Sequence, residues 1–414
     1  MVKECIILAG GLGTRLREAV PDLPKCMAPV AGRPFLFYVI NYLRSQGINS
    51  FTFSLGYKHE LIEAYLQANF SSLDYRCVIE DEPLGTGGAI RLACARILEK
   101  NVLVTNGDTL FRVDVEALDQ VQEARQPLAT LALKPMTSFD RYGVVEINDE
   151  SQVTGFREKK YYDQGLINGG TYLIDVQQFM QLDLPSRFSF ETDVLEPQAL
   201  KGQLAGSVQD GYFIDIGIPE DYKRAGQDLA LPPLDLKKID KSWTLFLDRD
   251  GVVNEDAPGT YVFGPDNFTF LEGAPGFFKK LTDLFGQIIV ATNQRGVGRK
   301  LMTLDDLAAV NRKMTDGIEA AGGKIRNIYA ATEMPDTDPL RKPNPGMAFQ
   351  ARHDFPEIDF SRSIMVGNNI TDMEFGKNAG MYTVFVLTTS PDVTLPHPDI
   401  DLIFPTLFDF AKAL

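Results

Sequence analysis

Cysteine and histidine, the residues that build disulfide frameworks and zinc sites, are scarce in this chain of 414 residues. The four cysteines, Cys5, Cys26, Cys77 and Cys94, form no C-x-x-C pair, and the three histidines are scattered. We therefore expect neither a disulfide framework nor a structural zinc site. A cytoplasmic protein with reduced thiols is the simplest interpretation.

Long apolar runs and an excess of basic residues are also missing. No run approaches the roughly 20 residues that a transmembrane helix needs, and the chain starts without an apolar signal segment. Because 56 acidic residues outnumber 41 basic ones, the net charge is −15. The composition therefore predicts no nucleic-acid partner and no membrane partner, although local Arg and Lys clusters can still bind anionic substrates.

The sequence does contain two separate series in which short apolar strands alternate with amphipathic helices. The first runs from residue 3 to about 225, and the second starts at Trp243 and continues to the end. The stretch between them has paired prolines and a charged tail, which is typical of a linker. We predict an α/β fold with mainly parallel sheets, divided into domains at 1–229 and 243–414 with a linker at 230–242.

The first candidate site follows the apolar strand pattern of residues 6–9, where the sequence continues Gly10-Gly11-Leu12-Gly13-Thr14-Arg15. Glycines let the backbone approach a phosphate chain, and a helix starting after Thr14 would add a favourable dipole. Arg15 and Lys25 are candidates to neutralise that anion. With Pro24-Lys25 at this distance, the stretch from Leu8 to Pro34 resembles the start of sugar-1-phosphate nucleotidyltransferases.

The resemblance implies an α/β nucleotidyltransferase domain with a Rossmann-like sheet, and it assigns roles further along the chain. Asp108 and Asp215 would hold Mg²⁺, while Arg15, Lys25 and the metal stabilise attack of a sugar 1-phosphate on the α-phosphorus. The implied nucleotide-binding residues are Leu8, Gly10, Gly11, Gly13, Thr14, Glu82, Gly85, Thr86, Gly87 and Asp108. The implied sugar-phosphate-binding residues are Lys159, Asn168, Gly169 and Glu191.

The second candidate site begins where the apolar strand pattern of residues 245–247 delivers Asp248-Arg249-Asp250-Gly251. An aspartate at a strand end can attack phosphorus, and an aspartate two residues on, along an extended segment, can act as acid and base. Thr292 follows another strand pattern, and Lys342 follows later. In this order the motifs resemble those of the haloacid-dehalogenase (HAD) phosphohydrolases, which implies a HAD-type Rossmannoid sheet.

The HAD resemblance implies that Thr292 binds the phosphoryl group and that Lys342 neutralises the nucleophile. The implied Mg²⁺ ligands are Asp248, Asp250, Asn368 and Asp372. The family usually has aspartate where Asn368 stands, so this site has lost one negative charge.

Within the HAD superfamily, residues 248–251 and 292–299 are similar to heptose-bisphosphate and histidinol-phosphate phosphatases. Those relatives commonly carry a zinc loop before the lysine, but residues 332–342 contain no Cys or His. We expect Asn293, Arg295 and Arg299 to contact the sugar phosphate.

The two resemblances predict a bifunctional enzyme of nucleotide-activated heptose synthesis. It would remove the 7-phosphate of heptose 1,7-bisphosphate and transfer a nucleotidyl group, with GTP as the implied donor, to heptose 1-phosphate. Two alternatives stay open: a hexose-1-phosphate nucleotidyltransferase joined to a phosphatase of other specificity, and a second domain that serves as a regulatory scaffold impaired at Asn368. The residues themselves leave the base and the oligomeric state open.

Overall fold

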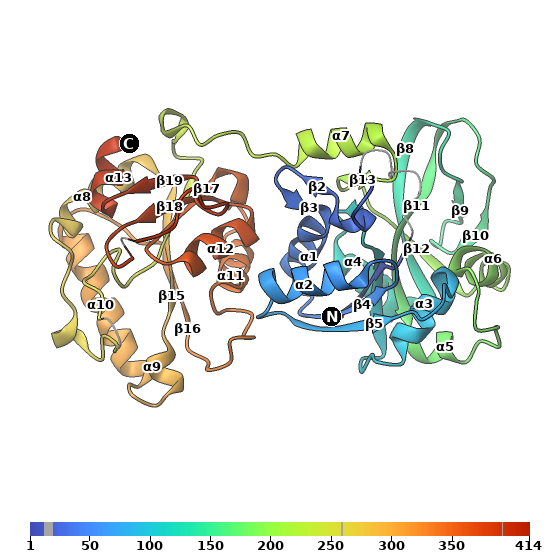
Figure 1. Cartoon of the computed structure of the whole chain (residues 1–414), viewed down its shortest axis with the longest axis horizontal. Helices are drawn as coiled ribbons and strands as arrows, with labels where there is room; N and C mark the ends of the chain where they lie inside the picture. The colour runs from blue at the N-terminus through green and yellow to red at the C-terminus, as the bar shows by residue number, and fades with distance from the viewer. Residues whose placement is uncertain (12–19, 258–259, 391) are drawn as a thin grey trace. The chain divides into compact units, whose positions relative to one another are not determined.

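The computed structural model describes residues 1–11, 20–257, 260–390 and 392–414. Gly13, Thr14 and Arg15, three residues of the predicted phosphate-binding turn, lie outside the described residues. The chain forms two compact units, Met1–Ala230 and Leu231–Leu414, each built around its own sheet (Figure 1).

The first unit has a seven-stranded sheet in the order β12-β8-β11-β6-β1-β4-β5. Its interior strand β1 has the sequence ECIILA and alternates between two cores, with Cys5 and Ile7 in one and Ile6 in the other. Neighbouring strands are parallel except at β11, which is antiparallel to both β6 and β8. The predicted α/β class is confirmed. The strands of this sheet are β1 (Glu4–Ala9), β4 (Ser50–Leu55), β5 (Asp74–Ile79), β6 (Asn101–Asn106), β8 (Ala129–Phe139), β11 (Tyr162–Asp175) and β12 (Leu204–Val208).

Helices cover both faces of this sheet because its strands are apolar on both sides. The core that contains Ile7 is closed by α1, α2 and α4, and the core that contains Ile6 by α3, α5 and the segment after residue 187. The helices are α1 (Phe35–Ser45), α2 (His59–Asn69), α3 (Gly85–Cys94), α4 (Val115–Arg125), α5 (Val176–Met180), α6 (Glu196–Leu200) and α7 (Pro219–Asp228), with a 3₁₀ turn η2 (Lys25–Met27) and a π-helical turn η3 (Glu191–Leu195). Short strands outside the main sheet are β2 (Pro29–Val30), β3 (Arg33–Pro34), β7 (Thr109–Phe111), β9 (Val145–Ile147), β10 (Val153–Phe156) and β13 (Phe213–Asp215).

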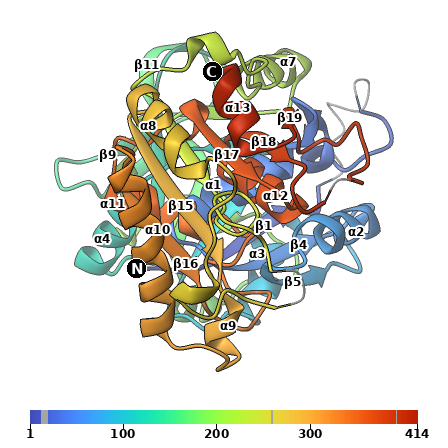
Figure 2. The same ribbon diagram turned by 90° about the vertical axis from the view of Figure 1, so that its left-hand side faces the viewer.

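The second unit has a six-stranded, fully parallel sheet in the order β16-β15-β14-β17-β18-β19. Leu245 and Leu247 face a core closed by α8, α10 and α13, whereas Phe246 faces a core closed by α11 and α12. Figure 2 shows α8 and α10 in front of β15. The strands are β14 (Thr244–Leu247), β15 (Gln287–Asn293), β16 (Asn327–Ala331), β17 (Ser363–Gly367), β18 (Tyr382–Val386) and β19 (Leu402–Phe404). The helices are α8 (Ala274–Leu284), α9 (Arg295–Gly298), α10 (Leu304–Ala320), α11 (Gly346–Asp354), α12 (Ile370–Ala379) and α13 (Leu407–Ala413), with 3₁₀ turns η4 (Leu236–Lys238), η5 (Pro265–Asn267) and η6 (Phe360–Arg362).

The register of the second sheet brings its candidate residues to one edge. Leu247 pairs with Val290 on one side and with Val366 on the other. Asp248, Thr292 and Asn368 therefore emerge at the carboxyl edge of the sheet, the usual place for ligands in open α/β folds. Among the described residues, no helix has the length and apolar character needed to cross a lipid bilayer.

Candidate functional sites

In the first unit, one lysine lies between the two predicted metal-binding carboxylates. The Nζ atom of Lys25 is 2.5 Å from Oδ2 of Asp108 and 3.2 Å from Oδ1 of Asp215. Burial lowers the pKa of Lys25, but the two carboxylates more than compensate and the net pKa is raised. Three residues that are far apart in the sequence thus form one charged cluster.

Strand pairing explains why the two aspartates meet. Asp108 follows β6, and Asp215 is the last residue of β13, which pairs antiparallel with β7 so that Asp215 lies opposite Thr109. The backbone N–H of Ile216 donates to the carbonyl oxygen of Asp108 at 3.1 Å. Both carboxylates can therefore share one cation.

The turn after β1 passes close to its neighbours. A Cβ atom on Gly10 would lie 3.0 Å from Oε1 of Glu80 and 3.2 Å from the backbone nitrogen of Gly56. Glu80 also accepts a hydrogen bond from the backbone of Leu84 at 3.0 Å. Glu80, which the sequence interpretation did not select, thus lies beside the Gly10 turn and holds the segment that leads into α3. A Cβ atom on Gly11 would meet nothing among the described residues.

The glycine-rich loop at residues 82–88 forms the start of α3, and two of its glycines serve packing. A Cβ atom on Gly87 would lie 2.2 Å from the ring of Phe188, and the Gly87 N–H already donates to the carbonyl oxygen of Phe188 at 3.0 Å. Gly85 has a φ of +73°, where glycine is favoured. The Gly87 amide is therefore engaged within the protein, while the exposed Glu82 and Thr86 face solvent.

Thr86 joins the predicted nucleotide loop to the predicted sugar site. Its hydroxyl donates to Oε2 of Glu191 at 2.7 Å and accepts a hydrogen bond from the backbone N–H of Phe190 at 2.9 Å. Ser189 also donates to Oε2 of Glu191 at 3.0 Å. The carboxylate of Glu191 is thus held beside the loop by two hydroxyls.

The other predicted sugar-site residues lie in different surroundings. Asn168, in the irregular part of β11, donates to the hydroxyl of Tyr172 at 2.9 Å and accepts from the Gly170 N–H at 3.0 Å. A Cβ atom on Gly169 would lie 2.3 Å from the Phe111 ring, so glycine is required there. Lys159 is exposed between β10 and β11, and no hydrogen bond or ion pair joins it to the described residues.

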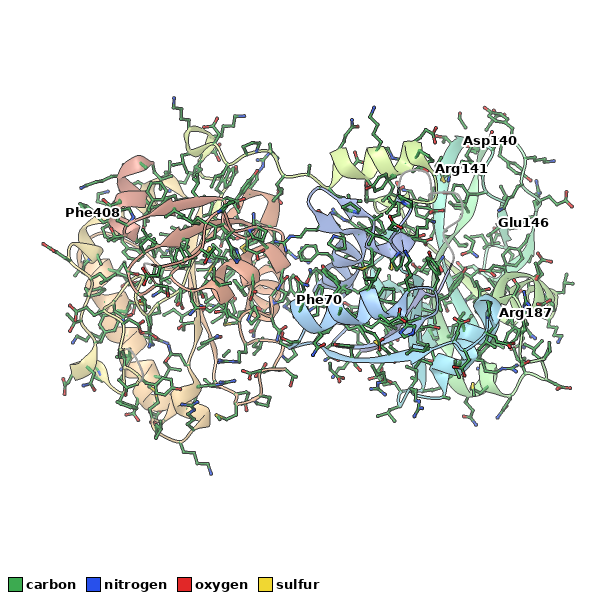
Figure 3. The ribbon with its side chains drawn as sticks, viewed as in Figure 1. Phe70, Asp140, Arg141, Glu146, Arg187 and Phe408 are labelled. Carbon is green, nitrogen blue, oxygen red and sulfur yellow. The ribbon has the colours of Figure 1, made fainter. Side chains whose placement is uncertain are left out.

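Arg141 and Tyr142 lie near Asp215, one of the two carboxylates that contact Lys25. Arg141, which is labelled in Figure 3, forms an ion pair with Asp221 of α7. The adjacent Tyr142 contacts Phe213, whose strand ends at Asp215. Burial raises the pKa of Tyr142 to about 12, and Asp215 adds to the rise. Tyr142 therefore stays neutral at ordinary pH and can only exchange hydrogen bonds with a ligand.

In the second unit, a buried lysine also bridges two carboxylates. The Nζ atom of Lys342 is 2.8 Å from Oδ1 of Asp248 and 2.6 Å from Oδ1 of Asp372, and it donates to the carbonyl oxygen of Ala291 at 2.9 Å. Burial lowers the pKa of Lys342, but the two aspartates outweigh this effect and the net pKa is raised. Burial raises the pKa of Asp248 to about 7; Lys342 opposes the rise, and Asp372 and Asp250 add to it.

Two residues after β15 support this arrangement. Asn293 exchanges two hydrogen bonds with the backbone of Lys342, at 3.0 and 3.1 Å, so its amide fixes the lysine. Thr292 is buried, and its hydroxyl accepts a hydrogen bond from Gln294 at 2.9 Å. The structure therefore places Thr292 beside the cluster and gives Asn293 a positioning contact in addition to its predicted sugar-phosphate role.

The expectation that residues 248–250 are extended is wrong, because the chain bends at Arg249 and turns at Gly251. The fully buried Arg249 donates to both carboxylate oxygens of Asp250, at 3.0 to 3.2 Å. Asn254 and Gln294 donate to the same carboxylate at 2.9 and 2.8 Å. The predicted acid/base is thus held by three side chains that the sequence interpretation missed, although a basic residue between two aspartates was a signal for the first of them.

Asn368 lies directly beside this bend. Its Nδ2 atom donates to the carbonyl oxygen of Asp250 at 3.1 Å and to the hydroxyl of Thr389 at 2.7 Å. The Asp250 carboxylate is held by Arg249, Asn254 and Gln294, and the Asp250 carbonyl oxygen is a further oxygen donor beside Asn368. Asp372 accepts hydrogen bonds from the backbone N–H groups of Asn368 and Asn369 at 3.1 and 3.0 Å.

The donor sets fit a hard divalent cation in both units. In the first unit, Asp108 and Asp215 already share one cationic group. In the second, the oxygen donors are the Asp248 carboxylate, the Asp250 carbonyl and the Asn368 amide. Mg²⁺ prefers oxygen ligands and usually completes its shell with water and substrate phosphate. Within the described ranges, no three His, Cys, Asp or Glu side chains gather as one metal-binding group, so a bound metal would depend on such additional ligands.

An acidic residue organises two arginines near the second site. Asp336 forms ion pairs with Arg295, at the start of α9, and with Arg341, which precedes Lys342; the latter pair is 3.2 Å apart. Arg295 and Arg341 are about four-fifths buried, at 19% and 18% side-chain exposure. Arg299 is exposed and lies over the Tyr261 ring at 5.9 Å. This ion-pair group occupies the segment in which related phosphatases were expected to carry zinc.

Comparison with known proteins assigns both units. A family model described as Nucleotidyl transferase matches residues 4–231, and one described as HAD-hydrolase-like matches residues 339–409. The D-glycero-alpha-D-manno-heptose 1-phosphate guanylyltransferase of Aneurinibacillus thermoaerophilus is 48% identical over 226 residues, which cover 55% of this chain and 98% of that enzyme.

Two solved structures match different parts of the chain. HddC from Yersinia pseudotuberculosis, complexed with GMP-PN, has a TM-score of 0.50 and 36% identity, and the match covers 55% of this chain and 99% of that one. The D,D-heptose 1,7-bisphosphate phosphatase of B. bronchiseptica, complexed with magnesium and phosphate, has a TM-score of 0.38 and 29% identity, with 41% and 97% of the two chains covered.

Because the first family model spans more than half of the chain, the protein belongs to the nucleotidyl transferase family. Residues 339–409 of its second unit match the HAD-like family model, and the two resemblances drawn from the sequence are confirmed.

Proposed function

We propose that this chain catalyses two consecutive steps in the synthesis of a nucleotide-activated heptose. The HAD-like unit would remove the 7-phosphate of D-glycero-D-manno-heptose 1,7-bisphosphate, and the first unit would transfer GMP from GTP to the resulting heptose 1-phosphate. The observation that carries the proposal is that each unit has a lysine between two aspartates at its predicted phosphate site. These clusters are Asp108–Lys25–Asp215 and Asp248–Lys342–Asp372.

Nucleotidyl transfer in the first unit needs positioning and charge neutralisation. An oxygen of the sugar 1-phosphate attacks the α-phosphorus of GTP, and pyrophosphate leaves. Lys25 would neutralise phosphate oxygens, while Tyr142 and Glu191 offer a hydroxyl and a carboxylate to the sugar. When bound by Asp108 and Asp215, Mg²⁺ would supply positive charge to the phosphates. Identity of 48% to a heptose 1-phosphate guanylyltransferase supports both the sugar and the guanine base.

Phosphate removal in the second unit uses a covalent step. A carboxylate oxygen of Asp248 attacks phosphorus, the sugar oxygen leaves, and Asp250 supplies its proton. Water then attacks the aspartyl phosphate and loses a proton to Asp250, which releases phosphate and restores Asp248. Lys342 favours the charged form of Asp248, against the effect of burial, and Arg295 and Arg341 would bind the second phosphate of the substrate. Mg²⁺ held by Asp248, the Asp250 carbonyl and Asn368 would neutralise phosphate charge.

Paired substitutions test the two activities separately. In Asp248→Asn, phosphate release from heptose 1,7-bisphosphate should fall to background, while pyrophosphate release from GTP and heptose 1-phosphate continues. In Asp215→Asn the reverse pattern is expected. Each variant serves as the folding control for the other. Unchanged phosphate release in Asp248→Asn would contradict the second active site, and wild-type protein that releases no pyrophosphate with any NTP would contradict the first.

The substrate range needs its own assay. The NTP and the sugar phosphate are each varied in assays of the wild-type protein. It should prefer GTP over other NTPs and heptose 1-phosphate over mannose 1-phosphate. A preference for a hexose 1-phosphate would exclude the heptose assignment. Release of phosphate only from other sugar phosphates would favour a phosphatase of other specificity, and no release from any of them would favour a scaffold impaired at Asn368.

A further inference from the structure

The second unit has a pocket at the edge of its sheet opposite to Asp248. It is formed where β14, β15, β16 and β17 begin, and its volume is about 490 Å³, within the range typical of small-molecule sites. Thr244 starts β14 and Asp248 follows the end of that strand. At about 3.3 Å per residue, roughly 13 Å of strand separates them. The pocket is therefore distinct from the phosphatase site.

Four cationic side chains line this pocket, and in the described part of the chain three of them are free of hydrogen bonds to helix-end carbonyl groups. These three are Lys324, Arg326 and Arg362, and among the residues that the structure describes no carboxylate forms an ion pair with any of them. Arg362 donates to the Ser242 hydroxyl at 3.2 Å, and Arg326 lies over the Phe355 ring at 4.5 Å. Hydrogen bonds from Ser242 lower the pKa of the exposed Asp240, and Arg362 lies close enough to contribute to this lowering, whereas no such interaction is found for Lys324 and Arg326 among the described residues. The remaining positive charge is available to an anion in a chain whose net charge is −15.

The other charged residues that line the pocket either form hydrogen bonds within the protein or are exposed. Lys241 donates to the carbonyl oxygens of Thr282 and Phe285, at 2.6 and 3.1 Å, and so caps the end of α8. Asp359 accepts hydrogen bonds from the backbone and hydroxyl of Ser361. The exposed Glu357 is the remaining acid of the lining. The local balance is positive, which favours an anion.

Aromatic residues also line the pocket. Trp243, the single tryptophan of the chain, lines the pocket and packs against Tyr382 with ring centroids 5.7 Å apart. Phe285 and Ile288 of the lining are buried. An indole that is only partly buried beside these cations suits a ligand with a planar ring and phosphate groups.

We propose that this pocket is a second nucleotide site that binds a nucleoside diphosphate or a sugar linked to one. The phosphates are held by Lys324, Arg326 and Arg362, and the base or sugar ring lies against Trp243. The site takes no part in either reaction of the proposed function, and its ligand belongs to the same chemical class as the expected product.

The fluorescence emission of Trp243 reports on binding at this pocket, and it can be measured in the full-length chain because Trp243 is the single tryptophan. GDP should change this emission in a saturable way, whereas pyrophosphate alone and guanosine alone should each bind more weakly than GDP. The double variant Lys324→Glu/Arg362→Glu should weaken GDP binding by roughly tenfold or more, because two charge-assisted contacts are replaced by repulsion. The matched control, Lys280→Glu/Arg312→Glu, reverses two exposed charges elsewhere in the same unit and should bind GDP like wild type.

Other outcomes would overturn the proposal. These are a Trp243 emission that does not respond to GDP, equal GDP affinity in Lys324→Glu/Arg362→Glu and wild type, or pyrophosphate binding as tightly as GDP. Retained phosphatase activity checks that the double variant is folded. If charge reversal abolishes folding, Lys324→Gln/Arg362→Gln should still weaken GDP binding, and unchanged affinity in that variant would equally refute the site.

Discussion

Lys342 forms ion pairs with Asp248 and Asp372 at 2.8 and 2.6 Å, although the three residues come from separate segments at the carboxyl edge of one sheet. Both Lys342 and Asp372 are almost fully buried, with side-chain exposures of 2%. A buried pair of carboxylates is costly without a cation. The lysine therefore has a structural task in addition to its proposed role in phosphate transfer.

Replacing this lysine should destabilise the second unit. In Lys342→Met the free energy of unfolding should fall by about 3–5 kcal/mol, because two buried carboxylates lose their counter-charge. Urea unfolding followed by Trp243 emission measures this unit, since the chain has no other tryptophan. Lys279→Met removes the exposed pair with Asp283 and should cost less than about 1 kcal/mol. Equal losses in the two variants would contradict the interpretation.

In the first unit, Lys25 lies where a divalent cation would be shared by Asp108 and Asp215. Lys25→Met should therefore bind Mn²⁺ more tightly than wild type when no nucleotide is present, because no ammonium has to leave. Calorimetry with Mn²⁺ measures this directly. Lys58→Met, which alters a lysine near Asp22, should leave the affinity unchanged. Weaker Mn²⁺ binding in Lys25→Met would show that lysine and metal do not compete.

Arg249 should act on the phosphatase through Asp250. With Arg249→Lys, fewer hydrogen bonds hold the Asp250 carboxylate, and kcat should fall on the order of 100-fold, as for small displacements of a catalytic group. The KM for the bisphosphate should change little, because Arg249 is fully buried and cannot contact substrate. Steady-state kinetics separates the two parameters, and a rise in KM at constant kcat would point to a different role.

Gly87 should tolerate no side chain while Phe188 is present. Gly87→Ala places a methyl group 2.2 Å from the Phe188 ring, and overpacking of this kind costs about 1–3 kcal/mol. Thermal unfolding should show the loss, and Gly87→Ala/Phe188→Leu should recover part of it by making space. If the double variant is no more stable than Gly87→Ala, the ring is not the cause.

Thiol chemistry should be slow at neutral pH. Burial raises the pKa of Cys77 to about 11 and those of Cys26 and Cys94 to about 12, and it also raises the pKa of Cys5. Since the thiolate is the reactive form, labelling of the partly exposed Cys77 should accelerate about tenfold per pH unit below that value. Cys77→Ala should remove the fastest labelling phase. Rapid labelling of Cys77 at neutral pH would refute the expectation.

Local sequence patterns were sufficient for several elements of the fold. The apolar spacing at 34–45 and 60–70 is typical of helices, and α1 and α2 lie there, shifted by one residue at most. The strand patterns at 6–9 and 245–247 correspond to β1 and β14, which are interior strands of their sheets. Short apolar runs bounded by glycine or aspartate are typical of strands buried in a parallel sheet.

Other features depended on contacts between distant residues. No spacing rule shows that β11 runs antiparallel between β6 and β8, or that the chain bends at Arg249 and so directs Asp250 toward Asn254 and Gln294. Contacts with residues about 100 positions away in the sequence decide such details, as the contact between Gly87 and the Phe188 ring shows.

The sequence by itself determined which chemical groups this protein carries: two aspartates and a lysine for each phosphate site, each set in the motif order of its own family. Only the tertiary structure decided how those groups are used. It brought Asp215 beside Asp108 through the pairing of β13 with β7, and it placed Lys342 between Asp248 and Asp372. The physical reason is that residue type fixes charge and hydrogen-bonding capacity, whereas strand register and burial fix distances, and electrostatic interactions depend on both.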